Sequence, residues 1–116
     1  MTISIDDLAR SLRAFADERD WGQFHSPKNL ASALSVEAAE LLEHFQWLTE
    51  AQSRELAPDK KAAVAEELAD VLLYLVQIAD KLDVDLLEAA QLKLVKNAAR
   101  YPVDKAAGTS TKYNEL

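Results

Sequence analysis

Apolar residues recur at helical spacing along most of this chain, and that periodicity restricts the fold more than any other feature. In four segments they return every three or four positions, which gathers them on one side of a helix. The 116 residues include only two Gly and three Pro, fewer turn residues than a sheet protein needs. A chain of this length forms one hydrophobic core. We therefore expect an all-α protein, a four-helix bundle.

Capping residues and prolines mark the expected ends of the first three helices. Ser4, followed by an acid at Asp7, is typical of a capping box that opens a helix fading near Asp20. Pro27 and Pro58 each suit the first position of a helix, where the missing N–H costs nothing. These signals predict helices over residues 4–20, 27–49 and 58–80, with a polar connection over 50–57.

The fourth helix is expected to begin after an aspartate and to end before a proline. Asp83 or Asp85 can cap it, and Pro102 disfavours helical backbone in the residue before it. The residues after this proline have little apolar content and no helical period. We expect one helical domain over residues 1–102 and a flexible tail over 103–116.

Charge and composition limit the partners. The formal net charge is −7, which opposes nonspecific binding to nucleic acid. A divalent cation can still bring one polyphosphate to such a surface. The chain has no cysteine and no apolar run of transmembrane length, and residues 1–7 lack the basic start and apolar run of a signal peptide. We expect a soluble cytoplasmic protein with neither a nucleic-acid nor a membrane partner.

Two acidic pairs break the apolar pattern of the two central helices. Glu37 and Glu40 stand three apart on one predicted helix, and Glu67 and Asp70 stand three apart on the next. On a helical wheel Glu37 falls inside the sector of the leucines, and Glu67 lies beside apolar neighbours. At least two of these acids therefore point toward the core.

The same four acids are expected to meet at one level of an antiparallel helix pair. In such a pair, the residue numbers of any two facing positions add up to the same total. Positions 37 and 70 have the same total as positions 40 and 67, so these acids should face one another. Buried like charges need neutralising, and an all-oxygen donor set favours Mg²⁺, with Mn²⁺ as the alternative. The structural alternative is that the acids face solvent or form ion pairs with Lys60, Lys61, Lys93 or Lys96.

A di-iron site is a poorer interpretation of these acids. It requires a Glu-x-x-His motif on each of two helices, but Leu41 stands three residues before His44. The other central helix contains no histidine.

Six segments of the sequence resemble a family of all-helical enzymes, the MazG-like nucleoside triphosphate pyrophosphohydrolases, and within it the dCTP pyrophosphatase branch. The resemblance runs from about Ile5 to Pro102. Its segments are Glu18-Arg19-Asp20-Trp21, Phe24-His25-Ser26-Pro27-Lys28-Asn29-Leu30, Val36-Glu37-Ala38-Ala39-Glu40-Leu41, Phe45-Gln46-Trp47, Glu66-Glu67-Leu68-Ala69-Asp70-Val71 and Lys93-x-x-x-Asn97-x-x-x-Tyr101-Pro102. The family's two acidic motifs fall on the four acids selected above. Val36 stands where MazG itself usually has a further glutamate, a departure shared with the dCTP branch.

The resemblance implies residue roles for a nucleotide site. It implies that Glu37, Glu40, Glu67 and Asp70 bind magnesium. Substrate contacts are implied for Trp21, His25, Trp47 and Tyr74 near base and sugar, and for Lys93 and Asn97 near phosphates or sugar. Packing or helix capping is the structural alternative for the aromatic and histidine side chains. We assign Glu40, with Glu66 as the alternative, to activate a water molecule.

The implied reaction is Mg²⁺-dependent hydrolysis of a nucleoside triphosphate to the monophosphate and pyrophosphate. The preferred substrate is dCTP or a modified cytosine deoxynucleotide, removed from the nucleotide pool. The resemblance also implies a homodimer or a dimer-based homotetramer. A noncatalytic metal-binding partner or regulatory protein is the alternative function.

Overall fold

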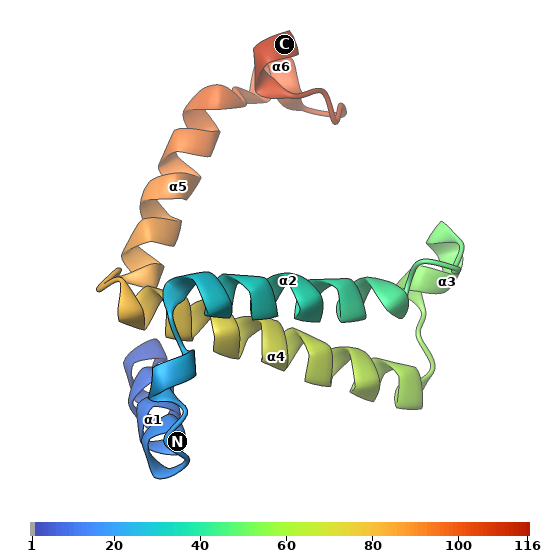
Figure 1. Cartoon of the computed structure of the whole chain (residues 1–116). Helices are drawn as coiled ribbons and strands as arrows, with labels where there is room; N and C mark the ends of the chain where they lie inside the picture. The colour runs from blue at the N-terminus through green and yellow to red at the C-terminus, as the bar shows by residue number, and fades with distance from the viewer. Residues whose placement is uncertain (1) are drawn as a thin grey trace. The chain divides into compact units, whose positions relative to one another are not determined.

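The computed structural model describes residues 2–116 as two compact units, one reaching to Val84 and one spanning Asp85–Leu116. Over these residues all regular elements are helical (Figure 1), which confirms the predicted all-α class. The first unit contains α1 (Ile5–Glu18), η1 (Gly22–Phe24), α2 (Pro27–Glu43), α3 (Glu50–Arg54) and α4 (Pro58–Lys81). The second contains α5 (Leu86–Arg100), α6 (Val103–Ala106) and η2 (Tyr113–Glu115).

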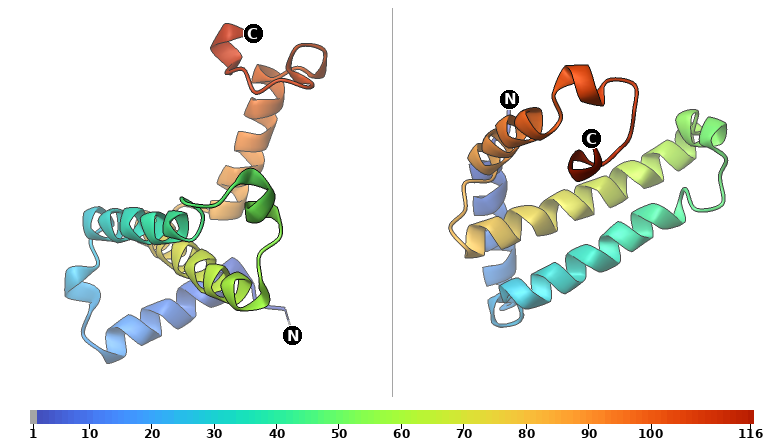
Figure 2. Two further views of the ribbon diagram at one scale, coloured as in Figure 1. Left: turned by 90° about the vertical axis from the view of Figure 1, so that its right-hand side faces the viewer. Right: turned by 90° about the horizontal axis from the view of Figure 1, so that it is seen from above.

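Helices α2 and α4 form the centre of the first unit. They lie side by side and run antiparallel in all three views (Figures 1 and 2), as predicted, and α1 packs on α4. Leu30 of α2 and Val76 of α4 are each only 1% exposed. Ala9 and Ala16 of α1 are also buried, and such small side chains let a helix approach its neighbour closely. The core of this unit is therefore an antiparallel hairpin with a third helix across it.

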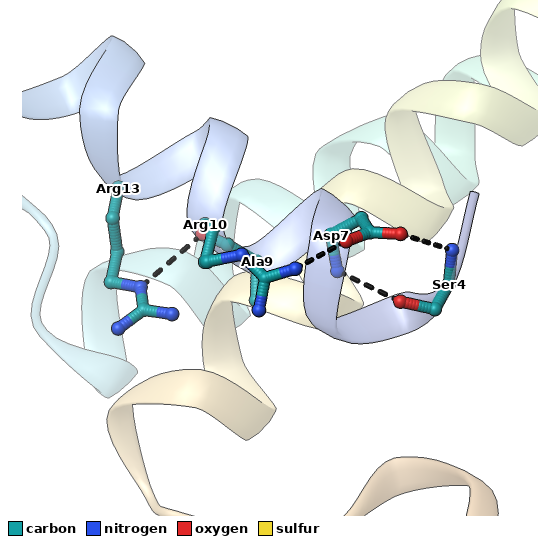
Figure 3. A network of polar contacts seen from close by, with 5 residues as sticks. All are labelled: Ser4, Asp7, Ala9, Arg10 and Arg13. Carbon is teal, nitrogen blue, oxygen red and sulfur yellow. Dashed lines mark hydrogen bonds and ion pairs between the residues drawn. The ribbon is translucent and has the colours of Figure 1, made fainter.

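A network of local hydrogen bonds fixes the start of α1 (Figure 3). The Ser4 hydroxyl accepts from the Asp7 backbone N–H, and the Asp7 carboxylate accepts from the Ser4 N–H, both at 3.0 Å. This reciprocal pair is the predicted capping box. The backbone N–H of Ser4 is the largest cause that lowers the pKa of Asp7, and Arg10 adds an ion pair. Arg13 donates to the Ala9 carbonyl one turn further on, at 3.4 Å.

The predicted end of the second helix, near Thr49, is wrong. Helix α2 ends at Glu43, and the backbone then turns through residues 44–47. A new helix, α3, begins inside the segment expected to be a connection, because Thr49 and Gln52 form a second capping box. The apolar period continues past the true helix end, so periodicity alone overestimated its length.

A residue in the left-handed backbone conformation follows the end of each of the other two long helices of the first unit. Asp20 has φ 53° and Asp83 has φ 54°, a backbone region that aspartate tolerates better than most residues. Helix α1 accordingly ends at Glu18, slightly before the predicted position, and α4 ends at Lys81, close to it. Of the two aspartates considered as the cap of α5, Asp85 fills that role by accepting from the Glu88 N–H at 3.0 Å.

The second unit consists of α5 and the segment expected to be a tail. Helix α5 ends at Arg100, before the Tyr101-Pro102 pair that was predicted to stop it. The following segment contains α6 and η2, so it is more regular than the sequence indicated. Tyr113 packs edge-on against Tyr101, with ring centroids 6.0 Å apart, and the Arg100 guanidinium lies over it. The flexibility of the tail stays a prediction.

A candidate metal centre beside an aromatic pocket

Three of the four selected acids come together between α2 and α4. Glu37 from α2 and Glu67 and Asp70 from α4 each offer an oxygen atom, and these atoms lie within 4.8 Å of one another. The i, i+3 spacing places Glu67 and Asp70 on one face of α4, and the antiparallel pairing sets Glu37 opposite them. Glu40 is outside this group of three but close enough to Glu37 to influence its ionisation.

Burial makes this group unfavourable without a cation. Glu37 Oε2 and Glu67 Oε2 are buried and have no hydrogen-bond partner in the described part of the chain. Leaving a charged oxygen unpaired away from water costs several kcal/mol, and about 3–5 kcal/mol when one partner of a buried ion pair is removed. A hard divalent cation would satisfy both atoms, and the donors are all oxygen. The residues present therefore fit a divalent-cation site.

The acids also raise the pKa of Glu37 from its ordinary value of 4.5 to about 7. A hydrogen bond with the Glu40 carboxyl is the largest cause, because two carboxyl groups can share a proton but not two charges. Burial is the next cause, followed by the charges of Glu40, Asp70 and Glu67. A cation among the oxygens would oppose this rise, because its charge favours the ionised carboxylate.

This shift predicts how the metal-free protein responds to pH. A carboxyl whose pKa is higher in the folded state binds its proton more tightly there, so its contribution favours folding in acid and is lost as the pH rises through about 7. We expect urea unfolding in EDTA to show lower stability at about pH 8 than at about pH 5.5. Mg²⁺ should restore more stability at the higher pH, where the carboxylate is ionised.

The variant Glu37→Gln provides the control for this pH dependence, because it cannot titrate at this position. In that variant, the loss of stability with rising pH in EDTA should be smaller than in the wild type. The stability gained on adding Mg²⁺ should be smaller as well. Identical pH profiles for wild type and Glu37→Gln would contradict the assignment.

His44 lies beside the acids and was not among the predicted site residues. Its Nε2 is 3.8 Å from Glu67 Oε1, and both side chains are about four-fifths buried, at 21% and 20% exposure. The signal was present in the sequence, because position 44 follows Glu40 by four residues and Glu37 by seven, on one face of the helix.

An aromatic pocket adjoins the acids. A cavity of about 160 Å³ between α1, the following loop and α4 is lined by Trp21, His25 and Tyr74, with Asp70 also in its wall. Trp21 packs edge-on against Phe15 and against His25, at centroid distances of 5.7 and 6.3 Å. The structure thus brings three of the predicted base-contacting residues together, next to an acid of the candidate metal centre.

The loop that carries Trp21 and His25 is held by its own polar contacts. The Asn29 amide of α2 donates to the Phe24 carbonyl at 2.9 Å, and the Gln23 amide donates to the Asp20 carbonyl at 3.0 Å. These bonds fix the short helix η1 between α1 and α2, so the aromatic wall has a defined position.

The remaining predicted site residues belong to other parts of the chain. Trp47 is 87% exposed in the turn after α2 and is not part of the pocket wall. Glu66 is exposed on α4. Lys93 and Asn97 belong to α5 of the second unit, four residues apart and hence on one face of it. The functional roles of all these residues stay predictions.

Comparisons with known proteins agree with this architecture and identify the class. A model of the MazG-like family matches residues 32–116. The chain therefore belongs to the MazG-like family, and the predicted resemblance and bundle type are confirmed. Within the family it is similar to dCTP pyrophosphatase 1 of Rattus norvegicus, with 45% identity over 115 residues that cover 97% of this chain and 68% of the relative.

Two further relatives give the same result. The human protein called dCTP pyrophosphatase 1 is also 45% identical, again over 97% of this chain and 68% of its own length. The crystal structure of a pyrophosphatase from Archaeoglobus fulgidus has a TM-score of 0.81 and 41% identity, and the match covers 88% of this chain and 95% of that one.

Proposed function

We propose that this protein is a Mg²⁺-dependent pyrophosphohydrolase that converts dCTP, or a modified cytosine deoxynucleotide, to the monophosphate and pyrophosphate. The observation that carries the proposal is the acidic group of Glu37, Glu67 and Asp70 beside the aromatic pocket. The predicted enzyme class is confirmed by the relatives named dCTP pyrophosphatase 1. The choice of Mg²⁺ rests on the all-oxygen donor set.

Glu37, Glu40, Glu67 and Asp70 would hold the Mg²⁺, which when bound neutralises phosphate charge and lowers the pKa of water. Glu40, which stands outside the group of three, is the carboxylate that we assign to orient the attacking water and take its proton. Glu66 is the alternative. His44 Nε2 lies 3.8 Å from Glu67 Oε1, and this contact would help to orient the Glu67 carboxylate.

The aromatic pocket would take the base and sugar. Trp21 and Tyr74 offer faces for stacking, and His25 offers a ring nitrogen for a polar contact. Lys93 and Asn97, from the second unit, would contact phosphates or sugar, and Trp47 would contact the base. A lysine suits this role as a point charge for phosphate.

We further propose that the enzyme is a cytoplasmic homodimer or dimer-based homotetramer. The described residues contain no helix long and apolar enough to cross a membrane. Several large apolar side chains are exposed to solvent in the single chain, and exposed apolar surface of this kind usually marks a protein contact. Val36 and Leu68 of the first unit are 56% and 52% exposed, and Leu94 and Val95 of the second are 69% and 71% exposed.

A panel of triphosphates tests the proposed function. Pyrophosphate release should be measured for the common deoxynucleoside and ribonucleoside triphosphates, and for 5-methyl-dCTP, with Mg²⁺ and with EDTA. We expect turnover only with the cation and highest kcat/KM for a cytosine deoxynucleotide. Release of orthophosphate instead of pyrophosphate, or no turnover by folded protein, would contradict the proposal. The second outcome would favour the noncatalytic metal-binding alternative.

A further inference from the structure

We propose that Gln77 determines base specificity by accepting a hydrogen bond from the exocyclic amino group of the base. The inference rests on the proposed function and deepens it, because it names the chemical group that separates accepted from rejected substrates. It is carried by the position of Gln77 in the pocket and by the hydrogen bond that its amide already makes.

Gln77 lies at the end of the pocket away from the acids. It follows Asp70 by seven residues and Tyr74 by three on α4, and all three line the same cavity. Seven residues of helix amount to roughly 10 Å along its axis, on one face. A triphosphate held near Asp70, with its base against Tyr74, would therefore present the far edge of that base to Gln77.

The orientation of the Gln77 amide is fixed by α4 itself. Its Nε2 donates to the Leu73 carbonyl at 3.2 Å. A carbonyl oxygen only accepts, so the NH₂ end of the amide must face Leu73 and Oε1 is left as the acceptor end. Turning the amide over would set two oxygens against each other and lose the bond, which makes the turned state unfavourable.

An acceptor held in this way distinguishes an amino group from an oxo group. Cytosine carries an amino donor at position 4, whereas uracil and thymine carry an oxygen there. The cytosine amino group would complete a hydrogen bond to Oε1, and the oxo group would face it without one. Sites built to bond a particular polar group discriminate more strongly than apolar pockets that differ by size alone. Gln77 would thus favour dCTP over dUTP through binding of the base.

The test compares dCTP and dUTP in the wild type and in Gln77→Met, which has similar length but no amide. We expect the wild type to prefer dCTP and the variant to reduce the ratio of kcat/KM values by about tenfold or more, mainly through KM for dCTP. Gln91→Met, which changes an exposed glutamine on α5, should leave the ratio unchanged. Gln77→Ala serves in its place if circular dichroism shows that Gln77→Met does not fold.

Binding of dCMP and dUMP without metal gives a second readout that does not depend on turnover. Equilibrium dialysis should show tighter binding of dCMP by the wild type and a reduced difference in the variant. An unchanged dCTP/dUTP ratio in a folded Gln77 variant would overturn the inference and leave the proposed function standing. Equal use of both substrates by the wild type would overturn the inference and the proposed cytosine preference, but not the proposed pyrophosphohydrolase activity. Failure of the proposed function would show as absence of all turnover, and equal binding of dCMP and dUMP would then overturn this inference as well.

Discussion

Replacing Glu37 by glutamine is expected to lower kcat/KM for dCTP by about 10³-fold or more while the protein stays folded. The substitution keeps the shape of the side chain but removes a charge from the group of three acids. A catalytic cation contributes several kcal/mol of charge stabilisation in the transition state, and about 1.4 kcal/mol corresponds to a tenfold change in rate. Stability should not fall in the metal-free protein, since the change removes a source of repulsion among buried carboxylates.

The matched control is Glu43→Gln on the same helix. Glu43 is exposed at the end of α2 and is not part of the acidic group, so its variant should hydrolyse dCTP within about twofold of the wild-type rate. Steady-state kinetics with a pyrophosphate assay, together with circular dichroism of both variants, makes the comparison. A Glu37→Gln variant as active as Glu43→Gln would remove Glu37 from the site.

Leu30→Ala is expected to produce the largest loss of stability among single changes in the central hairpin, about 2–5 kcal/mol in the free energy of unfolding. Leu30 is only 1% exposed, so truncation removes apolar contacts and leaves a cavity that α2 and α4 cannot easily close. The transition should move to lower urea concentration in equilibrium unfolding.

Leu42→Ala provides the comparison for this core variant. Leu42 lies on the same helix but is 58% exposed in the single chain, so the same chemical change should cost much less. Both variants must be measured at one protein concentration, because association of subunits adds to apparent stability. Equal losses for the two leucines would show that the packing of the hairpin has been assigned wrongly.

Local signals in the sequence were sufficient for the starts of α1, α2 and α4 and for the acidic pairs. Ser4 with Asp7, and Pro27, act through neighbouring backbone atoms, so their effect does not depend on the rest of the fold. Glu37 was conspicuous because a charged residue occupied a position of the apolar stripe. The antiparallel hairpin then required the two acidic pairs to lie at similar height.

Features that depend on competing local signals or on tertiary contacts were harder to predict. The end of α2 was missed because an apolar period persists beyond Glu43, while Thr49 starts a separate helix with its own cap. The proximity of Trp21 to Tyr74 depends on how α1 packs on α4, which spacing within one helix does not specify. The spacing of His44 from Glu40 indicates a shared helix face, but its contact with Glu67 depends on how α2 packs on α4.

Direct measurement of divalent-cation binding tests the central claim, that the acids between α2 and α4 form the metal centre of a triphosphate pyrophosphohydrolase. Mn²⁺ can be titrated into the nucleotide-free protein at about pH 8, above the raised pKa of Glu37, and free Mn²⁺ followed by electron paramagnetic resonance. We predict saturable binding by the wild type and by Glu43→Gln, competition by Mg²⁺, and loss of binding in Glu37→Gln. Equal Mn²⁺ binding by Glu37→Gln and wild type, or full hydrolysis of dCTP by a wild type that binds no divalent cation, would contradict this account.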